Sequence, residues 1–125
     1  MNIPENLKYS QEHEWVKVDG DSAYIGITDF AQSQLGDIIF IEYPEIGDTL
    51  SKGDVFGTVE AVKTVSDLFA PISGKILKIN DLLENSPELI NNDPYNDGWI
   101  IKMKIKNIKE IDILLDSKSY KGFLD

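Results

Sequence analysis

The most informative stretch of the chain is Val55-Phe-Gly-Thr-Val-Glu-Ala-Val-Lys-Thr-Val-Ser-Asp-Leu-Phe69. β-Branched residues are frequent on both sides of Lys63, and Ala70-Pro71 ends the second run, so we predict two strands that meet at this lysine. The turn lacks the Asn-Gly or Asp-Gly pair of the tightest hairpins. We therefore expect a slightly longer, type I-like turn with Lys63 at or near its apex, exposed to solvent.

Lys63 has a plain interpretation and a functional one. The plain one is a surface lysine that only keeps the protein soluble. Its neighbours favour a function, because turns normally carry Gly, Asn or Pro, and an apolar turn suggests that another protein reads the local shape. The apolar neighbours are Val59, Ala61, Val62 and Val65. A lysine amine on its flexible stem is also the usual acceptor for an acyl group.

The chain has 125 residues, no cysteine and one histidine, His13. This length suits one domain over 1–125, with a core over about 7–106 and a C-terminal helical segment over about 107–124. Without cysteine there is no disulfide, thiolate metal site or cysteine nucleophile, so any redox sulfur must arrive on a cofactor. A lone histidine disfavours a multi-histidine metal centre and a Ser-His-Asp arrangement. We expect neither a metal site nor catalysis by this chain alone.

The net charge of the chain disfavours some classes of binding partner. Twelve basic against 22 acidic side chains give a formal net charge of −10 at pH 7. Such a surface repels nucleic acid and anionic lipid and favours basic docking surfaces on other proteins. No apolar run approaches membrane-spanning length, and the first residues resemble neither a signal peptide nor a transit segment. We predict a cytoplasmic protein whose partners include neither nucleic acid nor a membrane.

The rest of the chain predicts short strands with a few short helices. Alternating apolar residues and Gly-rich turns mark the strands, and cap residues mark the helices. Strands are expected over 14–18, 23–27, 37–43, 55–62, 64–69, 73–79 and 99–105, and helices over 30–35, 86–90, 108–115 and 117–123. Residues 91–98 are expected to form a loop.

Individual residues are assigned to the ends of these elements. Thr28 or Asp29 is expected to cap the first helix, and Gly36 to end it in a left-handed conformation. Ser117 is the expected cap of the last helix. Trp15, in the first strand, is expected in the core.

A weak internal repeat supports a small two-sheet fold. Leu35-Gly-Asp-Ile-Ile-Phe-Ile41 resembles Ser73-Gly-Lys-Ile-Leu-Lys-Ile79, and the residues from Lys52 to Val59 resemble those from Asp97 to Lys104. Short strands with regular glycine turns and such a repeat favour a mainly β fold, a small β-sandwich or flattened barrel with short peripheral helices and a C-terminal helix. The strands beside Lys63 would then belong to the core sheets and present the lysine rigidly.

The residues around Lys63, Val59-Glu-Ala-Val-Lys-Thr-Val-Ser-Asp67, resemble the lipoylation motif of the glycine cleavage system H protein family. The similarity runs from about Leu7 to the C-terminal helix, and its motifs together are highly specific. They include Tyr9-Ser-Gln-Glu-His-Glu-Trp-Val16, Gly26-Ile-Thr-Asp-Phe-Ala-Gln32, Gln34-Leu-Gly-Asp-Ile38, Phe56-Gly-Thr-Val-Glu-Ala-Val-Lys63, Ser66-Asp67, Ala70-Pro-Ile-Ser-Gly74 and Asn92-Asp-Pro-Tyr-Asn-Asp-Gly-Trp99.

The resemblance implies a non-catalytic carrier with a lipoyl-domain fold, the barrel-sandwich hybrid, and with lipoate in amide linkage to Lys63. In this family the arm takes the aminomethyl group of glycine from a pyridoxal-phosphate glycine decarboxylase, the P protein. It passes the one-carbon unit to a tetrahydrofolate-dependent aminomethyltransferase, the T protein. A flavin (FAD) dihydrolipoyl dehydrogenase, the L protein, reoxidises the dithiol. A lipoate ligase, or an octanoyl or lipoyl transferase, is the implied attaching enzyme.

The departures from the family pattern are mild. Ala61 stands where the family commonly has Ser, and Thr64-Val65 where small residues are frequent. Neither change touches the acceptor amine of Lys63. They affect how efficiently an attaching enzyme recognises the hairpin rather than which lysine it modifies.

Other interpretations stay open. A lipoyl domain of a 2-oxo-acid dehydrogenase also presents a lysine, but that class usually has Asp before it and a Pro/Ala-rich linker. A biotin carrier more typically flanks its lysine with methionines, and Met1 and Met103 are far from Lys63 in the sequence. An H-like lipoyl donor, or an interaction module serving other lipoate-dependent enzymes, would share the hairpin.

A carrier of this kind needs to shelter its load. The aminomethyl group is a primary amine, expected to be protonated near neutral pH, and it is prone to hydrolytic loss in water. A cleft for such a cation needs one or two carboxylates beside apolar walls. Glu14, next to Trp15, and Asp67, four residues past Lys63, are the candidates for this clamp. The alternative is that both are ordinary solvated carboxylates, and His13 is expected to pack or hydrogen-bond rather than bind a ligand.

Overall fold

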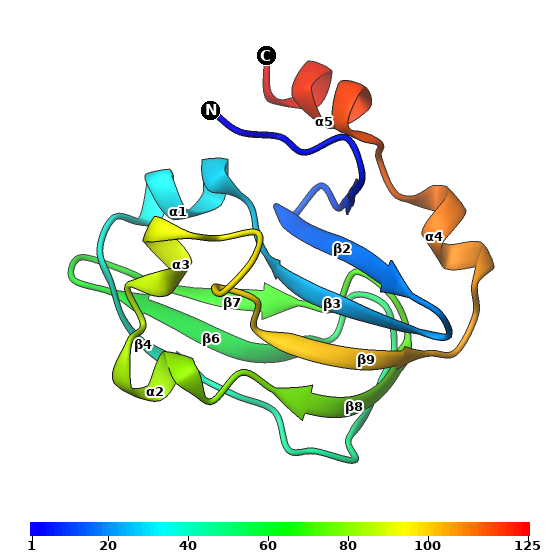
Figure 1. The fold of residues 1–125 in the computed structure, drawn as a ribbon, viewed down its shortest axis with the longest axis horizontal. Coiled ribbons are helices and arrows are strands. Elements are labelled where there is room, and N and C mark those ends of the chain that lie inside the picture. Colours follow the sequence, from blue (N-terminus) through cyan, green and yellow to red (C-terminus); the bar gives the residue numbers. More distant parts are fainter.

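The structure is a computed structural model that describes all 125 residues. Two antiparallel β-sheets face each other, with short helices around them (Figure 1). The large sheet has the strand order β1 (Lys8–Tyr9), β2 (Glu14–Asp19), β3 (Ser22–Ile27), β9 (Ile101–Ile105), β8 (Gly74–Ile79) and β5 (Thr49–Leu50). The small sheet has the order β4 (Ile38–Glu42), β6 (Val55–Ala61) and β7 (Val65–Phe69). The predicted mainly β fold, a flattened barrel or sandwich, is confirmed.

Five short helices surround the sheets. They are α1 (Asp29–Leu35), α2 (Leu82–Asn85), α3 (Leu89–Asn92), α4 (Lys109–Ile113) and α5 (Ser117–Leu124). Both chain ends lie on the side of the molecule that carries α5 (Figure 1). None of these helices is both long enough and apolar enough to cross a membrane.

A core of 20 buried apolar residues fills the space between the sheets. Alternation along each strand accounts for it, because every second side chain points to the same side of a sheet. Ile25 and Ile76 of the large sheet and Val59 of the small sheet are each at most 1% exposed, and burial of such a side chain contributes about 1.5–3 kcal/mol. Val59 and Leu68 belong to this core, so it anchors both strands that lead to Lys63.

A second cluster fixes the N-terminal segment against the C-terminal helix. It consists of Leu7, Tyr9, Trp15, Tyr95 and Tyr120. Trp15 is 1% exposed, which confirms its predicted place in the interior. Its indole N–H donates a hydrogen bond to the Pro94 carbonyl at 3.0 Å. A Cβ atom at Gly26 would lie 2.7 Å from the indole ring, so the ring packs where only glycine leaves room.

The segments of the internal repeat form corresponding strand pairs. β4 pairs with β6 in the small sheet, and β8 pairs with β9 in the large sheet. In each pair the register shifts at the same place in the repeat, between Ile38 and Phe40 and between Ile76 and Lys78. Such a bulge increases the local twist of a strand. The weak sequence repeat therefore corresponds to a repeated structural unit.

The predicted ends of the first helix are confirmed, and the last helix differs. Thr28 caps α1 by accepting a hydrogen bond from the Ala31 N–H at 3.2 Å, and Gly36 ends it with a positive φ of 80°, although its ψ of −157° differs from that of the predicted left-handed conformation. The cap of α5 is Asp116 rather than Ser117, because the Asp116 carboxylate accepts from the Ser119 N–H at 2.8 Å. A carboxylate makes a stronger cap than a hydroxyl because the bond is charge-assisted.

Two other elements are shorter than predicted, because residues distant in sequence bind their ends. β9 begins at Ile101 rather than at Trp99, because the Trp99 carbonyl accepts from the Asn80 side-chain amide at 2.7 Å. The predicted helix over 108–115 ends at Ile113 in α4. Leu115 instead exchanges two backbone hydrogen bonds of 2.8 Å with Tyr9.

The region between β8 and β9 departs most from prediction. The helical turn expected over 86–90 forms three residues later, as α3, which takes in Asn91 and Asn92 from the expected loop. A further short helix, α2, was not predicted. It follows Asn80, whose side-chain carbonyl accepts from the Leu82 N–H at 3.3 Å. Turns this short depend on a few such side-chain contacts.

Candidate functional site

Lys63 lies at the tip of the β6–β7 hairpin, exposed to solvent. The last ladder contact is the Ala61 N–H, which donates to the Thr64 carbonyl at 2.8 Å, so Val62 and Lys63 are the two central residues of the turn. Neither has a positive φ, which excludes the mirror-image turns of the tightest hairpins. The tip projects past α1 and α3 at the left of Figure 1.

The turn is held to the neighbouring strand as well as to the core. The Val62 N–H donates to the Asp37 carbonyl at 3.2 Å, and Ala61 is 3% exposed opposite Ile38 of β4. A backbone fixed on both sides cannot swing as a disordered stalk would. The hairpin thus presents the Lys63 side chain from a fixed backbone position.

Exposed apolar side chains gather on this part of the small sheet. We call the four of them, on β4 and the hairpin, the tip patch: Ile39 (51% exposed), Phe40 (55%), Val62 (67%) and Val65 (61%). Phe40 faces Glu60 across the sheet, and Glu60 faces Val65, so part of the patch forms one cross-strand row. Exposed apolar groups of this kind mark sites where another protein binds.

Glu14 is a buried carboxyl group at the start of β2, only 2% exposed. The Ser10 hydroxyl donates to its Oε1 at 2.6 Å, and the Phe69 N–H donates to its Oε2 at 3.4 Å. Burial raises the pKa of Glu14 to about 8, although both hydrogen bonds oppose that rise. Glu14 is therefore largely protonated at pH 7, and the alternative of an ordinary solvated carboxylate is wrong for this residue.

A cavity of about 270 Å³ lies between β7 and the segment that contains Glu14. β7 is an edge strand, so its outer side is not covered by another strand. Ser66, Asp67 and Leu68 of β7 form one wall, and residues 12–14 form the other. The remaining lining is mostly apolar and comes from Ile27, Val59 and α1, through Phe30, Ala31, Gln34 and Leu35.

The cavity brings together the two carboxylates that the sequence suggested. Glu14 and Asp67 both line it. Asp67 is exposed, so it lies toward the mouth, whereas the buried Glu14 lies deeper. Lys63 does not line the cavity, and its four-residue separation from Asp67 corresponds to roughly 13 Å along an extended strand.

Sequence reasoning missed one acidic residue of this site. Glu12 lines the cavity, and it also lines a neighbouring cavity of about 530 Å³ together with Glu14. Its negative charge adds to the rise in the pKa of Glu14. The run Glu12-His13-Glu14 could have indicated it. No sequence pattern indicated that α1 lines the cavity, because this depends on how the helix packs against the sheets.

A family model described as glycine cleavage H-protein matches residues 7–125. The glycine cleavage system H protein of Bacteroides thetaiotaomicron is 55% identical over 100% of this chain and 99% of that protein. The protein of the same name from Carboxydothermus hydrogenoformans is 55% identical over 98% of this chain and 95% of that protein. The crystal structure of a glycine cleavage system H protein from Mycobacterium marinum matches with a TM-score of 0.88 and 38% identity, covering 96% of this chain and 97% of that one.

Proposed function

Because the chain belongs to the glycine cleavage H-protein family, we propose that it carries lipoate on Lys63 and shuttles the aminomethyl group of glycine between enzymes. Its proposed partners are a pyridoxal-phosphate glycine decarboxylase, a tetrahydrofolate-dependent aminomethyltransferase, a flavin dihydrolipoyl dehydrogenase and an enzyme that attaches lipoate. The chain itself is proposed to be non-catalytic. Its single-domain organisation and its cytoplasmic location likewise stay predictions.

The position of Lys63 is the observation that carries this proposal. An acyl acceptor must be reachable by an attaching enzyme and must leave the modified arm free to visit other proteins. Lys63 is exposed at a hairpin tip whose two strands are anchored in the core, and no ion pair engages its amine. Lipoate, when attached, supplies the disulfide that accepts the transferred group. The chain supplies a fixed base for the arm.

The cavity beside β7 is the proposed shelter for the arm. The lysine side chain and the lipoyl chain in series contain about a dozen single bonds, which reach roughly 15 Å when extended. That length matches the distance along β7 to Asp67. The apolar lining fits the hydrocarbon chain, and Glu14 and Asp67 fit the amine at its end. We propose these two residues as the clamp for the loaded arm.

Protonated Glu14 makes the clamp responsive to its cargo. Without the amine, Glu14 lies in an apolar site with its pKa raised to about 8 and holds a proton at pH 7. A neighbouring ammonium group favours the ionised form and lowers that pKa. Glu14 then releases its proton and pairs with the ammonium, so the buried carboxylate is charged only when it has a partner. Burial is costly for an unpaired charge and less so for a paired one.

An exchange reaction tests the proposed function. Lipoylated protein mixed with glycine decarboxylase should support exchange of the glycine carboxyl group with labelled bicarbonate, at a rate that falls as salt screens the encounter. The protein alone should leave glycine unchanged. Lys63→Arg should abolish exchange, whereas Lys52→Arg should not. Exchange with the Lys63→Arg variant, or without the decarboxylase, would show that this chain is not such a carrier.

A further inference from the structure

The C-terminal helix contacts the wall of the cavity through Tyr120 and through Phe123, whose ring centroid lies 6.0 Å from that of His13. Tyr120 of α5 is fully buried, and its ring stacks on Tyr9 with 4.7 Å between centroids and 8° between planes. Its hydroxyl lies 2.8 Å from His13 Nδ1 and 2.8 Å from Thr28 Oγ1. Two hydrogen bonds therefore connect the last helix to the residue before Glu14 and to the cap of α1.

His13 has a backbone conformation that needs outside support. Its φ of 70° is the only positive φ at a residue other than glycine. A left-handed conformation is strained for a residue with a Cβ, and it persists only where the surroundings hold it. Backbone bonds give part of that support: the His13 N–H donates to the Ser10 carbonyl at 3.2 Å, and the His13 carbonyl accepts from the Thr28 N–H at 3.0 Å. The bond to Tyr120 is the side-chain part.

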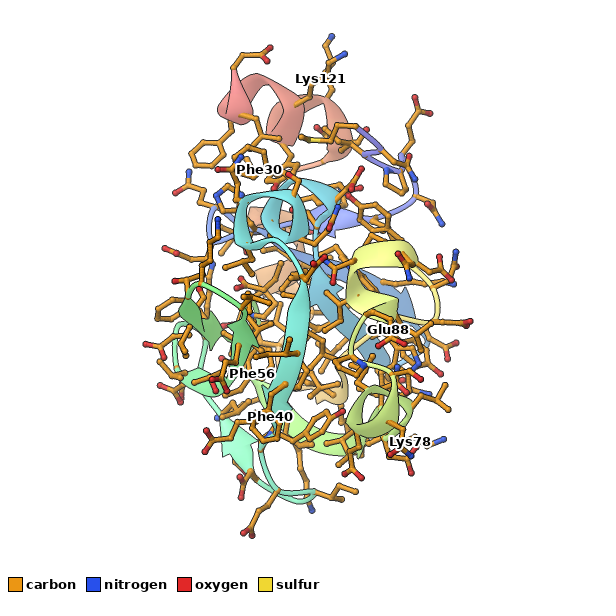
Figure 2. The ribbon with its side chains drawn as sticks, turned by 90° about the vertical axis from the view of Figure 1, so that its left-hand side faces the viewer. Phe30, Phe40, Phe56, Lys78, Glu88 and Lys121 are labelled. Atoms are coloured by element: carbon orange, nitrogen blue, oxygen red, sulfur yellow. The ribbon has the colours of Figure 1, made fainter.

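The same residues border the proposed shelter. His13 and Phe30 both line the cavity, and their rings lie 4.9 Å apart. Phe30 belongs to α1 and lies on the side of that helix that faces α5 (Figure 2). Because His13 immediately precedes Glu14, the left-handed backbone at His13 sets the direction in which the Glu14 side chain points from the first position of β2. A change at His13 therefore moves the carboxyl group that lies against β7.

The hydroxyl of Tyr120 satisfies both partners at once. A phenol can donate one hydrogen bond and accept another. Thr28 Oγ1 already accepts from the Ala31 N–H, and burial lowers the pKa of His13, so a neutral imidazole faces Tyr120 near pH 7. In either tautomer of His13 the hydroxyl donates to one partner and accepts from the other. Removing that one oxygen atom breaks both bonds and leaves the ring in place.

We propose that Tyr120 is a positioning residue for the arm cavity: its hydroxyl holds His13 in the left-handed conformation and thereby holds Glu14 against β7. The C-terminal helix then controls how well the cavity shelters the arm, although no residue of that helix lines the cavity. The importance of this link for the carrier rests on the proposed function. The link itself can be tested without lipoate.

Nuclear magnetic resonance of the unmodified chain provides that test. His13 is the only histidine, so its ring signals are assigned without ambiguity. A positive φ brings the amide hydrogen close to the Hα of the same residue and gives a strong nuclear Overhauser effect between them. In Tyr120→Phe we expect this effect to weaken and the ring ¹⁵N shifts to move toward a mixture of tautomers. Unchanged His13 signals in a folded Tyr120→Phe variant would overturn the proposal.

Tyr43→Phe is the matched control. The Tyr43 hydroxyl donates to the Asn80 carbonyl at 2.6 Å, and Tyr43 does not line the cavity. Removing it deletes a hydroxyl group of the same kind at another site. The His13 signals should stay unchanged in this variant. A change equal to that in Tyr120→Phe would mean that any lost hydroxyl loosens the fold, and would also overturn the proposal.

Release of the carried amine tests the consequence. With loaded protein, Tyr120→Phe should release ammonia and formaldehyde about threefold to tenfold faster, the factor expected from loss of the hydrogen bond to His13. In a His13→Gly background, where glycine adopts a positive φ without strain, Tyr120→Phe should add nothing further. Additive effects would overturn the proposal. Failure of the wild-type protein to become loaded would count against the proposed function, while the His13 signals still decide the link.

A second pair of variants covers the case in which Tyr120→Phe does not fold. His13→Ala and His13→Gly both lose the bond to Tyr120, but only glycine accepts the left-handed backbone freely. Release should be faster from His13→Ala than from His13→Gly. Equal release rates would show that the backbone conformation at His13 does not govern the cavity.

Discussion

The Phe69 N–H donates a hydrogen bond to Glu14 Oε2 at 3.4 Å, across 55 residues of sequence. This contact places the buried carboxyl group of the N-terminal segment against the strand that leaves the Lys63 hairpin. Glu14 thus lies beside the C-terminal end of β7, and Lys63 lies just before its N-terminal end. An arm that folds back along this edge meets Asp67 first and Glu14 next.

Lipoate should attach to Lys63 alone. After expression with lipoate and a lipoate ligase, intact mass should rise by one lipoyl group, and peptide mass spectrometry should locate it on Lys63, because this amine alone lies at the tip of the anchored hairpin. Lys63→Arg should keep the fold and abolish the addition. Lipoate found on Lys52 or Lys75 would contradict the assignment.

The clamp predicts faster loss of the carried group when its charge is removed. The double variant Glu14→Gln/Asp67→Asn should be lipoylated normally, but should release ammonia and formaldehyde about tenfold faster or more, because charge-assisted hydrogen bonds are worth about 1.5–3 kcal/mol each. Glu42→Gln/Asp48→Asn makes the same two substitutions at residues that do not line the cavity. Equal release from both double variants would dismiss the clamp.

Stability should depend on pH through Glu14. The pKa of Glu14 is about 8 in the folded chain and near the ordinary 4.5 when unfolded, so the folded state binds the extra proton between these values. Its contribution is fully present below pH 4.5 and is lost as pH rises through 8, by at most about 5 kcal/mol. Urea unfolding of the wild type and Glu14→Gln at pH 5 and pH 9 checks this. Glu14→Gln should gain stability relative to the wild type at the higher pH, and a constant difference would contradict the raised pKa.

Gly26→Ala should destabilise the fold by about 1–3 kcal/mol, because the added methyl group overlaps the Trp15 indole, 2.7 Å away. Urea unfolding followed by tryptophan fluorescence measures the loss. Gly122→Ala is the control: nothing lies within 4 Å of a Cβ there, and the residue is in α5, so alanine should be neutral or stabilising by about 0.5–1 kcal/mol. Similar losses in both variants would rule out a specific contact with Trp15.

The sequence alone predicted the seven longer strands, the hairpin and the position of Lys63 within it, but not the two-residue strands β1 and β5. These features follow from alternation, turn residues and caps, which act between residues that are close along the chain. Thr28 and Gly36 bound α1 as predicted for the same reason. The family motifs around Lys63 extended this prediction to the proposed attachment site, and the chemistry of the carried amine extended it to Glu14 and Asp67.

The burial and the hydrogen bonds of those carboxylates depend on the tertiary structure. Nothing near Glu14 in the sequence shows that it is 2% exposed, because its burial depends on β7 and on α1. The same holds for His13, whose left-handed backbone is supported by Tyr120, 107 residues away. The start of β9 and the end of α4 also differ from the predicted ones, because Asn80 and Tyr9 form hydrogen bonds there with residues that are distant in sequence. Burial and long-range hydrogen bonds form only when the sheets close, and therefore no local pattern encodes them.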